Sequence, residues 1–227
     1  MNGDAAITLL AQRCGNRTDP EFRPLALAEM GLVQETTLEQ GPLLPWFLVK
    51  DTNRLGTNLT WTAGVEYVDL PADFVGFEDD LACGVWIVDT EADPSDPDPF
   101  IELHRKPYAA MKEFSRNAND DSSDSPYAFD IIGSSLYLRP VQLVDQTIRL
   151  IYLGKDVAPA DTATANLWLT NAADLLIAET GIVLATNYVV DQEIAAGFVA
   201  SKNIAAARLV IKNEAMKHMM QDYTMGD

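Results

Sequence analysis

The stretch that decides the fold is YAFDIIGSSLYLRPVQLVDQTIRLIYLGKDV, residues 127–157. Apolar and polar residues alternate along 127–132, along 136–139 and again along 147–153, which is the pattern of half-buried β-strands. The connections between these runs are short, and Gly133 marks the first turn. Because parallel strands need crossovers of a dozen residues or more, the pattern predicts an antiparallel β unit.

Further β structure is expected on the N-terminal side of this unit. Strands are predicted at residues 65–70, 84–89 and 99–105, and residues 45–51 read as an extended segment. Residues 106–116 are expected to form a short helix, since Tyr108, Met111 and Phe114 recur at near-helical spacing.

Two acidic segments separate these elements. Residues 89–99 hold five acids and three prolines, and residues 117–125 hold three acids among small polar residues. Neither has the Gly at position six and the Glu at position twelve that a calcium-binding EF-hand loop requires. Both are therefore interpreted as exposed acidic loops, and no metal site is expected.

Helices are expected at both ends of the chain. Near the N-terminus they cover residues 4–15 and, after the Asp19-Pro20 pair, about 21–40. Near the C-terminus they cover residues 166–190 and 192–223. The former is apolar almost all the way round, which requires cover on more than one side.

This arrangement predicts an α+β fold in which N- and C-terminal helices enclose an inserted antiparallel β module. The expected segments are N-terminal helices at 1–44, a β-rich module with acidic loops at 45–160, and C-terminal helices with a tail at 161–227.

The net charge of −18 is unevenly distributed. Residues 61–165 hold 20 acids against 7 bases, whereas the flanking parts of the chain are close to neutral. Such a surface repels phosphates and is unlike a nucleic-acid-binding face. Two interpretations stay open: the charge maintains solubility, or it repels a polyanion deliberately.

The remaining composition points to a soluble protein made in a reducing compartment. Cys14 and Cys83 are far apart and in no metal-ligand spacing, so both are expected to be reduced. No apolar run approaches the about 20 residues that are needed to span a bilayer, so no membrane partner is expected.

Residues for catalysis are few. His104 and His218 are the only histidines, and neither adjoins a nucleophile motif. The chain has no G-x-S-x-G, P-loop, G-x-G-x-x-G or H-E-x-x-H motif. We therefore expect no catalytic residues, no cofactor and no enzymatic activity.

The last helix carries a methionine-rich face. Met216, Met219, Met220 and Tyr223 recur at spacings of three and four residues, so a helix places them on one side. This face is either core within the same chain or a docking surface, for which flexible thioethers are well suited.

Several short motifs follow one another in a characteristic order between about residues 40 and 180. They are Pro45-Trp46-Phe47-Leu48, Val68-Asp69-Leu70-Pro71-Ala72-Asp73-Phe74, Pro126-Tyr127-Ala128-Phe129, Gly133, Leu136-Tyr137-Leu138-Arg139-Pro140, Ile151-Tyr152, Asn166-Leu167-Trp168-Leu169 and Asp174-Leu175-Leu176. By their order and spacing the sequence resembles the head-to-tail adaptor (connector) proteins of short-tailed bacteriophages. Residues 140–145 form a longer and more apolar link than the Pro-x-Pro-Asp link of many relatives.

The resemblance implies a structural virion protein without an active site. Copies of it, typically twelve, would form a ring below the portal protein at the tail vertex, after assembly in the host cytoplasm. The ring would join the portal to the tail nozzle or tube protein, and genome DNA would pass through it without specific binding. The alternatives are another phage tail-tube component or a β-rich protein-interaction domain.

Within that interpretation three groups of residues are expected to carry function. Leu176 and Val183 would lie between subunits, because the apolar helix needs external cover. Glu78, Asp79 and Asp80 would face the lumen of the ring and repel DNA. Portal binding would use the C-terminal face, formed by Met216, Met219, Met220, Tyr223 and Met225.

Overall fold

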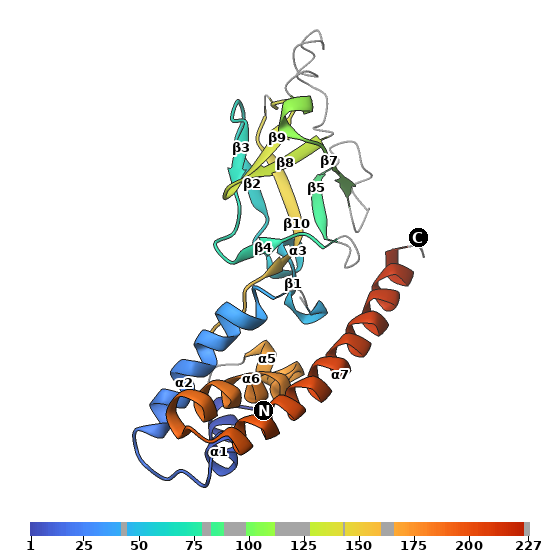
Figure 1. The fold of residues 1–227 in the computed structure, drawn as a ribbon. Coiled ribbons are helices and arrows are strands. Elements are labelled where there is room, and N and C mark those ends of the chain that lie inside the picture. The colour runs from blue at the N-terminus through green and yellow to red at the C-terminus, as the bar shows by residue number, and fades with distance from the viewer. Residues whose placement is uncertain are drawn as a thin grey trace. The chain divides into compact units, whose positions relative to one another are not determined.

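The computed structural model of the chain consists of two compact units (Figure 1). Met1–Leu48 and Lys155–Asp227 form a helical unit, and Val49–Gly154 form a β module inserted between them. The structure describes residues 1–41, 45–78, 83–88, 99–111, 128–142, 144–159 and 166–224, without the side chains of 219–224.

One long strand organises the larger sheet of the β module. β10 (Gln146–Gly154) pairs antiparallel with four strands, two along each of its edges. β1 (Val49–Asp51) and β2 (Leu59–Trp61) lie along one edge, and β5 (Gly84–Val88) and β4 (Phe74–Gly76) lie along the other. β6 (Phe100–Glu102) extends the sheet beyond β5.

The smaller sheet of the β module has four strands in the order β3-β9-β8-β7. Its centre is the hairpin of β8 (Ala128–Ile132) and β9 (Ser135–Arg139), which turns at Gly133 with a φ of 63°. β3 (Tyr67–Asp69) pairs antiparallel with β9, and β7 (His104–Arg105) pairs parallel with β8. A short helix, α3 (Thr52–Leu55), follows β1.

The two sheets share one apolar core. Alternation turns every second residue of each strand inward, and those residues are the large apolar ones. From the larger sheet come Val85, Ile87, Ile148, Leu150 and Tyr152, and from the smaller sheet Phe129, Leu136 and Leu138. Trp61 is fully buried among them and donates its indole N–H to the Val65 carbonyl at 2.7 Å.

The predicted α+β fold with an inserted β module is confirmed, but one predicted neighbourhood was wrong. All three alternating runs are strands, β8, β9 and β10. However, β10 does not continue the β8–β9 hairpin, since it is the central strand of the other sheet. Period-two alternation determines which residues of a strand face the core, but it does not determine which strand lies beside it. After Arg139 the chain passes from the smaller sheet to the larger one.

The helical unit is built around α6 (Ala173–Leu184). Its apolar circumference is covered by α1 (Gly3–Arg13), α2 (Phe22–Val33), α5 (Leu167–Asn171) and α7 (Gln192–Thr224) (Figure 1). α2 runs into a π-helical turn, η1 (Gln34–Leu38), and α6 into a second one, η4 (Ala185–Val189). A short 3-10 turn, η2 (Trp46–Leu48), precedes β1.

A buried polar cluster holds the segment that re-enters the helical unit after the β module. Glu39 Oε1 accepts hydrogen bonds from Gln34 Nε2 at 2.8 Å, from the backbone N–H of Asp156 at 3.1 Å and from Trp168 Nε1 at 3.2 Å. Asn166 Nδ2 donates to Gln34 Oε1 at 2.8 Å and to the Val157 carbonyl at 2.6 Å. The cluster satisfies buried groups that would otherwise cost stability.

Candidate docking surface

α7 begins at a capped turn and packs on α6 along one narrow stripe. The Asp191 carboxylate accepts from the backbone N–H of Glu193 at 2.9 Å and of Ile194 at 3.1 Å, which satisfies donors at the helix start. Phe198, Ala205, Leu209 and Asn213 are the buried side chains of α7. Their spacing places them on one side of the helix.

Polar contacts fix α7 within the helical unit. Lys202 Nζ lies 2.8 Å from Glu179 of α6, and the Asn213 side-chain oxygen accepts from the backbone N–H of Trp46 at 2.9 Å. Arg208 and Asp174, both more than half exposed, lie 3.8 Å apart. Asn213 is the last buried residue among those described in α7, Met216 and Lys217 are half-buried, and the helix runs on to Thr224.

The opposite side of α7 exposes an apolar stripe, which we call the α7 stripe. It consists of Val199, Ile204, Val210 and Ile211, between 42% and 70% exposed. Exposed alanines, among them Ala207, lie between them. Single exposed apolar residues are ordinary on a soluble protein, whereas four on one helix face indicate a surface that another molecule covers.

The same helix is basic in an acidic chain. Between residues 200 and 218 it carries Lys202, Arg208, Lys212 and Lys217 against Glu214 alone. Since the whole chain has a net charge of −18, this stretch attracts acidic surfaces that the rest of the chain repels.

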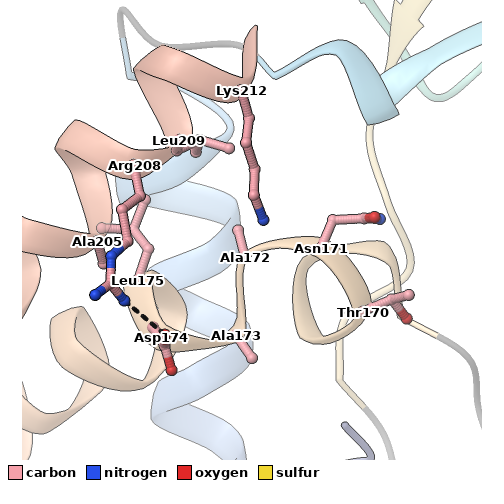
Figure 2. Close-up of a pocket in the computed structure, with 10 residues that line it drawn as sticks. All are labelled: Thr170, Asn171, Ala172, Ala173, Asp174, Leu175, Ala205, Arg208, Leu209 and Lys212. Atoms are coloured by element: carbon pink, nitrogen blue, oxygen red, sulfur yellow. Dashed lines mark ion pairs between the residues drawn. The ribbon is translucent and has the colours of Figure 1, made fainter. Parts of the chain in front are cut away.

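A pocket of about 210 Å³ opens beside the stripe (Figure 2). Its floor is the junction of α5 and α6, residues 170–175, and its other wall is α7 with Ala205, Arg208, Leu209 and Lys212. The Lys212 side chain extends from α7 toward Ala172, and Arg208 reaches Asp174. The pocket therefore has a mixed polar and apolar base, which includes Asp174, and two cationic side chains at its rim.

The residues predicted to lie between subunits differ in their environment. Leu176 is 0% exposed, packed within the core of its own chain, whereas Val183 is half-buried near the end of α6. We expected neighbouring subunits to cover the apolar surface of α6, but α1, α2, α5 and α7 of the same chain cover most of it. An intersubunit role of α6 remains a prediction, and the structure leaves only its partly exposed residues available for it.

The methionine face predicted for portal binding lies on a continuous helix, as expected. Met216 is half-buried, and α7 continues through 219, 220 and 223. The side chains of Met219, Met220 and Tyr223, and Met225 altogether, lie outside the described residues. Their role as a docking face stays a prediction.

The acidic residues predicted to face a lumen are described only in part. Glu78 follows β4 and is half-buried, whereas Asp79 and Asp80 lie outside the described residues, as do most of the acidic segments 89–99 and 117–125.

Ion pairs within the described part of the β module engage five of its bases. Arg149 donates from Nε to Asp51 Oδ1 at 3.1 Å and from Nη2 to Oδ2 at 2.8 Å, and its guanidinium lies over the rings of Trp86 and Phe100. The other described pairs are Lys50 with Asp73, Arg54 with Asp51, Arg105 with Asp130 and Arg139 with Glu66. The module has 19 acids and 8 bases, so its acids remain in excess.

Candidates for catalytic chemistry are sparse in the part of the chain that the structure describes. There, no three His, Cys, Asp or Glu side chains are grouped to hold a metal ion. Both cysteines are free, as expected, and burial raises the pKa of the Cys14 thiol, which keeps it unreactive. His104 and His218 are exposed.

The sequence also led us to expect no segment able to cross a bilayer, and that expectation was wrong for α7. Between Gln192 and His218 this helix is long and apolar enough by length and composition alone, and only 17% of the qualifying stretch is buried. This is weak evidence for a membrane span, because Lys202 and Arg208 on that stretch pair with acids of α6. We interpret the exposed apolar content as a protein-docking surface.

The α7 stripe was not among the sites expected from the sequence. Ile204 and Ile211 are two turns apart and were a readable signal, but α7 is rich in alanine on all sides. The side of α7 that faces α6 is the side that carries Phe198. The packing of the two helices determines this side, and the sequence of α7 alone does not.

Two comparisons with known proteins bear on this surface. The family model described as SU10 adaptor protein matches residues 25–220, which include both the β module and most of α7. No curated protein matches the chain.

Proposed function

Because the chain belongs to the SU10 adaptor protein family, we propose that it is the head-to-tail adaptor of a bacteriophage, joining the portal protein to the tail. Copies of the chain form a ring at the tail vertex of the virion, twelve in the form that the resemblance implies, after assembly in the host cytoplasm. The role is structural, and no enzymatic step, cofactor or membrane belongs to it. Its partners are the portal, a tail nozzle or tube protein and further copies of itself.

The observation that carries this proposal is the unpartnered side of α7. A helix of 33 residues with one buried stripe and one exposed apolar stripe suits a protein that is completed by assembly. The family match favours an adaptor over the alternatives of a tail-tube component or a β-rich interaction domain.

We assign the portal contact to the C-terminal part of α7. Beyond Asn213, the last buried residue among the described side chains of α7, the helix continues to Thr224, which adds about 16 Å at 1.5 Å per residue. An amphipathic helix end with methionines on one face fits a hydrophobic groove on a partner.

The acidic β module fits a channel that DNA must pass without sticking. Each phosphate that a base neutralises strengthens DNA binding through counterion release. Five bases of the module are already paired with acids: Lys50, Arg54, Arg105, Arg139 and Arg149. We propose that part of the surplus acid, with Glu78, Asp79 and Asp80, lines the lumen. Its repulsion would act within a Debye length of about 8–10 Å.

A truncated chain tests the proposal. Protein ending at Asn213 keeps the buried side chains Phe198, Ala205, Leu209 and Asn213 of α7, so we expect it to stay folded by circular dichroism. It should fail to bind rings of the portal protein from the same virus in a pull-down, while the full chain binds.

The matched control is the full chain with Ile101→Ala, which removes an exposed apolar side chain from the β module and should bind normally. Undiminished binding by the truncated chain would move the portal contact elsewhere. If the full chain binds tail-tube protein but no portal, the adaptor role itself is wrong.

A further inference from the structure

The turn between α6 and α7 exposes an apolar residue in an unfavourable backbone conformation. Val190 has a φ of 54° and is 78% exposed. A β-branched residue rarely occupies the left-handed region, where glycine or asparagine is at ease. Neither burial nor backbone preference within one chain explains a valine here, and such outliers often mark functional positions.

Val190 lies two residues after Tyr188, whose side chain reaches α2, and exposed apolar and acidic residues of α2 and α7 accompany this turn. Tyr188 is 47% exposed, and its hydroxyl donates to Glu29 Oε1 of α2 at 2.8 Å. Leu32, 53% exposed, lies one turn after Glu29 on the same helix. With Glu193 in the first turn of α7, these five residues form what we call the turn knob: Glu29, Leu32, Tyr188, Val190 and Glu193.

A surface with the opposite charge lies elsewhere on the same helical unit. The pocket beside α7 carries Arg208 and Lys212 at its rim (Figure 2). Ile204 and Ile211 of the α7 stripe are exposed on the same helix. Arg208 is 68% exposed and meets Asp174 only at 3.8 Å, so it can turn to a new partner at little cost. We call these four residues with the pocket the α7 groove.

We propose that the turn knob of one copy docks into the α7 groove of a second copy. Apolar side chains then meet apolar side chains, and Glu29 and Glu193 meet Arg208 and Lys212. The inference rests on the proposed function and identifies which surfaces of the chain hold neighbouring copies together.

Charge complementarity selects a second copy as the occupant. In a chain of net charge −18, residues 200–218 of α7 are a basic stretch with exposed apolar side chains. The turn knob offers acids for the bases of this stretch and apolar side chains for its apolar ones. The turn knob and the α7 groove are different surfaces. When two copies dock, the first therefore keeps a free groove and the second keeps a free knob. Repetition of such a contact generates a closed ring or a filament.

Charge reversal provides the first test. The measurement is sedimentation velocity of the full chain over a range of concentrations, alone and with portal rings present. Arg208→Glu with Lys212→Glu should weaken self-association by about tenfold or more, and so should Glu29→Lys with Glu193→Lys. A chain that carries all four changes should regain self-association, because each altered knob then faces an altered groove.

Rescue is the deciding outcome. If the fourfold variant is as weak as either double variant, or if both double variants associate like the unmodified chain, the proposal is wrong. A full chain that does not self-associate under either condition also overturns it. Because portal binding is assigned to the end of α7, all variants should still bind portal rings as single copies. If a variant binds portal but the predicted effects on self-association are absent, the knob-and-groove contact is wrong while the proposed function stands.

A second variant excludes misfolding as the explanation. Val190→Gly removes the apolar side chain and suits the left-handed backbone, so the helical unit should unfold at the same or a higher temperature. Self-association should nevertheless fall by about tenfold, the effect of losing one well-buried apolar anchor. A variant that is as stable and associates as strongly as the unmodified chain would show that Val190 is not part of an interface.

Discussion

Phe198 of α7 lies so close to Gly181 of α6 that a Cβ built on the glycine would come 2.3 Å from its ring. The two helices therefore approach each other through a site that only hydrogen can occupy. Phe198 is 3% exposed and cannot move toward solvent without opening the contact. The position and rotation of α7, and with them the direction of the α7 stripe, depend on this pair.

Gly181→Ala should destabilise the helical unit by about 1–3 kcal/mol, the usual cost of overpacking a core. The matched control is Gly197→Ala on α7, where an added Cβ meets nothing within 4 Å. This control should be neutral or stabilising by up to about 1 kcal/mol, since alanine is the better helix former. Urea unfolding followed by circular dichroism at 222 nm measures both, and equal effects would contradict the tight contact.

Leu176→Glu and Val183→Glu should have different consequences. Leu176 is fully buried, so a carboxylate there should unfold the helical unit of a single chain. Val183 is half-buried, so its variant should fold and lose particle incorporation if α6 contributes to an intersubunit contact. Thermal unfolding and incorporation into particles distinguish the two; normal incorporation of Val183→Glu would exclude α6 from the interface.

The Asp51–Arg149 pair predicts a pH dependence of the β module. Burial raises the pKa of Asp51, but the hydrogen bonds and charge of Arg149 and two backbone N–H groups outweigh it, so the pKa lies below its usual value. The ionised carboxylate thus contributes stability that is fully present above the ordinary pKa of about 3.9. This contribution is lost as the pH falls through the lower, folded-state pKa.

Asp51→Asn should therefore cost about 2–4 kcal/mol at pH 7, and the cost should shrink below about pH 4. Denaturant unfolding of the two proteins between pH 2 and pH 7, at roughly unit steps, measures the difference. Asp69→Asn, at an exposed position of β3, is the control and should change stability little at any pH. A cost for Asp51→Asn that does not vary with pH would contradict the ionic role.

Replacing Glu78, Asp79 and Asp80 together by Lys tests the acidic lumen. If these residues line the channel, particles should assemble but eject DNA slowly, and the defect should ease as salt rises, because counterions compete for the phosphates. The neutral variant with Gln, Asn and Asn at the same positions is the control, since it removes repulsion without adding attraction. Normal ejection of the lysine variant at low salt would place these residues outside the channel.

The strand and helix pattern could be predicted from the sequence because it depends on local periodicity. Alternation over 127–153 located β8, β9 and β10, and the apolar run after Asn166 located α5 and α6. The partner of β10 could not be predicted, since every residue of that strand has the same in–out pattern whichever strand lies beside it. The short strands β2 and β4 were missed because three residues carry too little periodicity.

The docking surface was less predictable for a related reason. The sequence drew attention to Met216 and the residues after it, because their spacing was regular. The exposed side of α7 at Ile204 and Ile211 appears only once α6 has covered the opposite side, at Phe198 and Leu209. A helix with alanine on every side does not reveal which face is core.

Val49 and Leu153 are direct partners in the antiparallel pair of β1 and β10, so the β module leaves and returns at neighbouring points. To the helical chain, an insertion of more than a hundred residues is topologically equivalent to a short hairpin loop. The chain entropy lost when the two ends of the insertion are held together grows only slowly with the length of the insertion. The module is thus joined to the helical chain in the way that a loop is, through two adjacent strand ends.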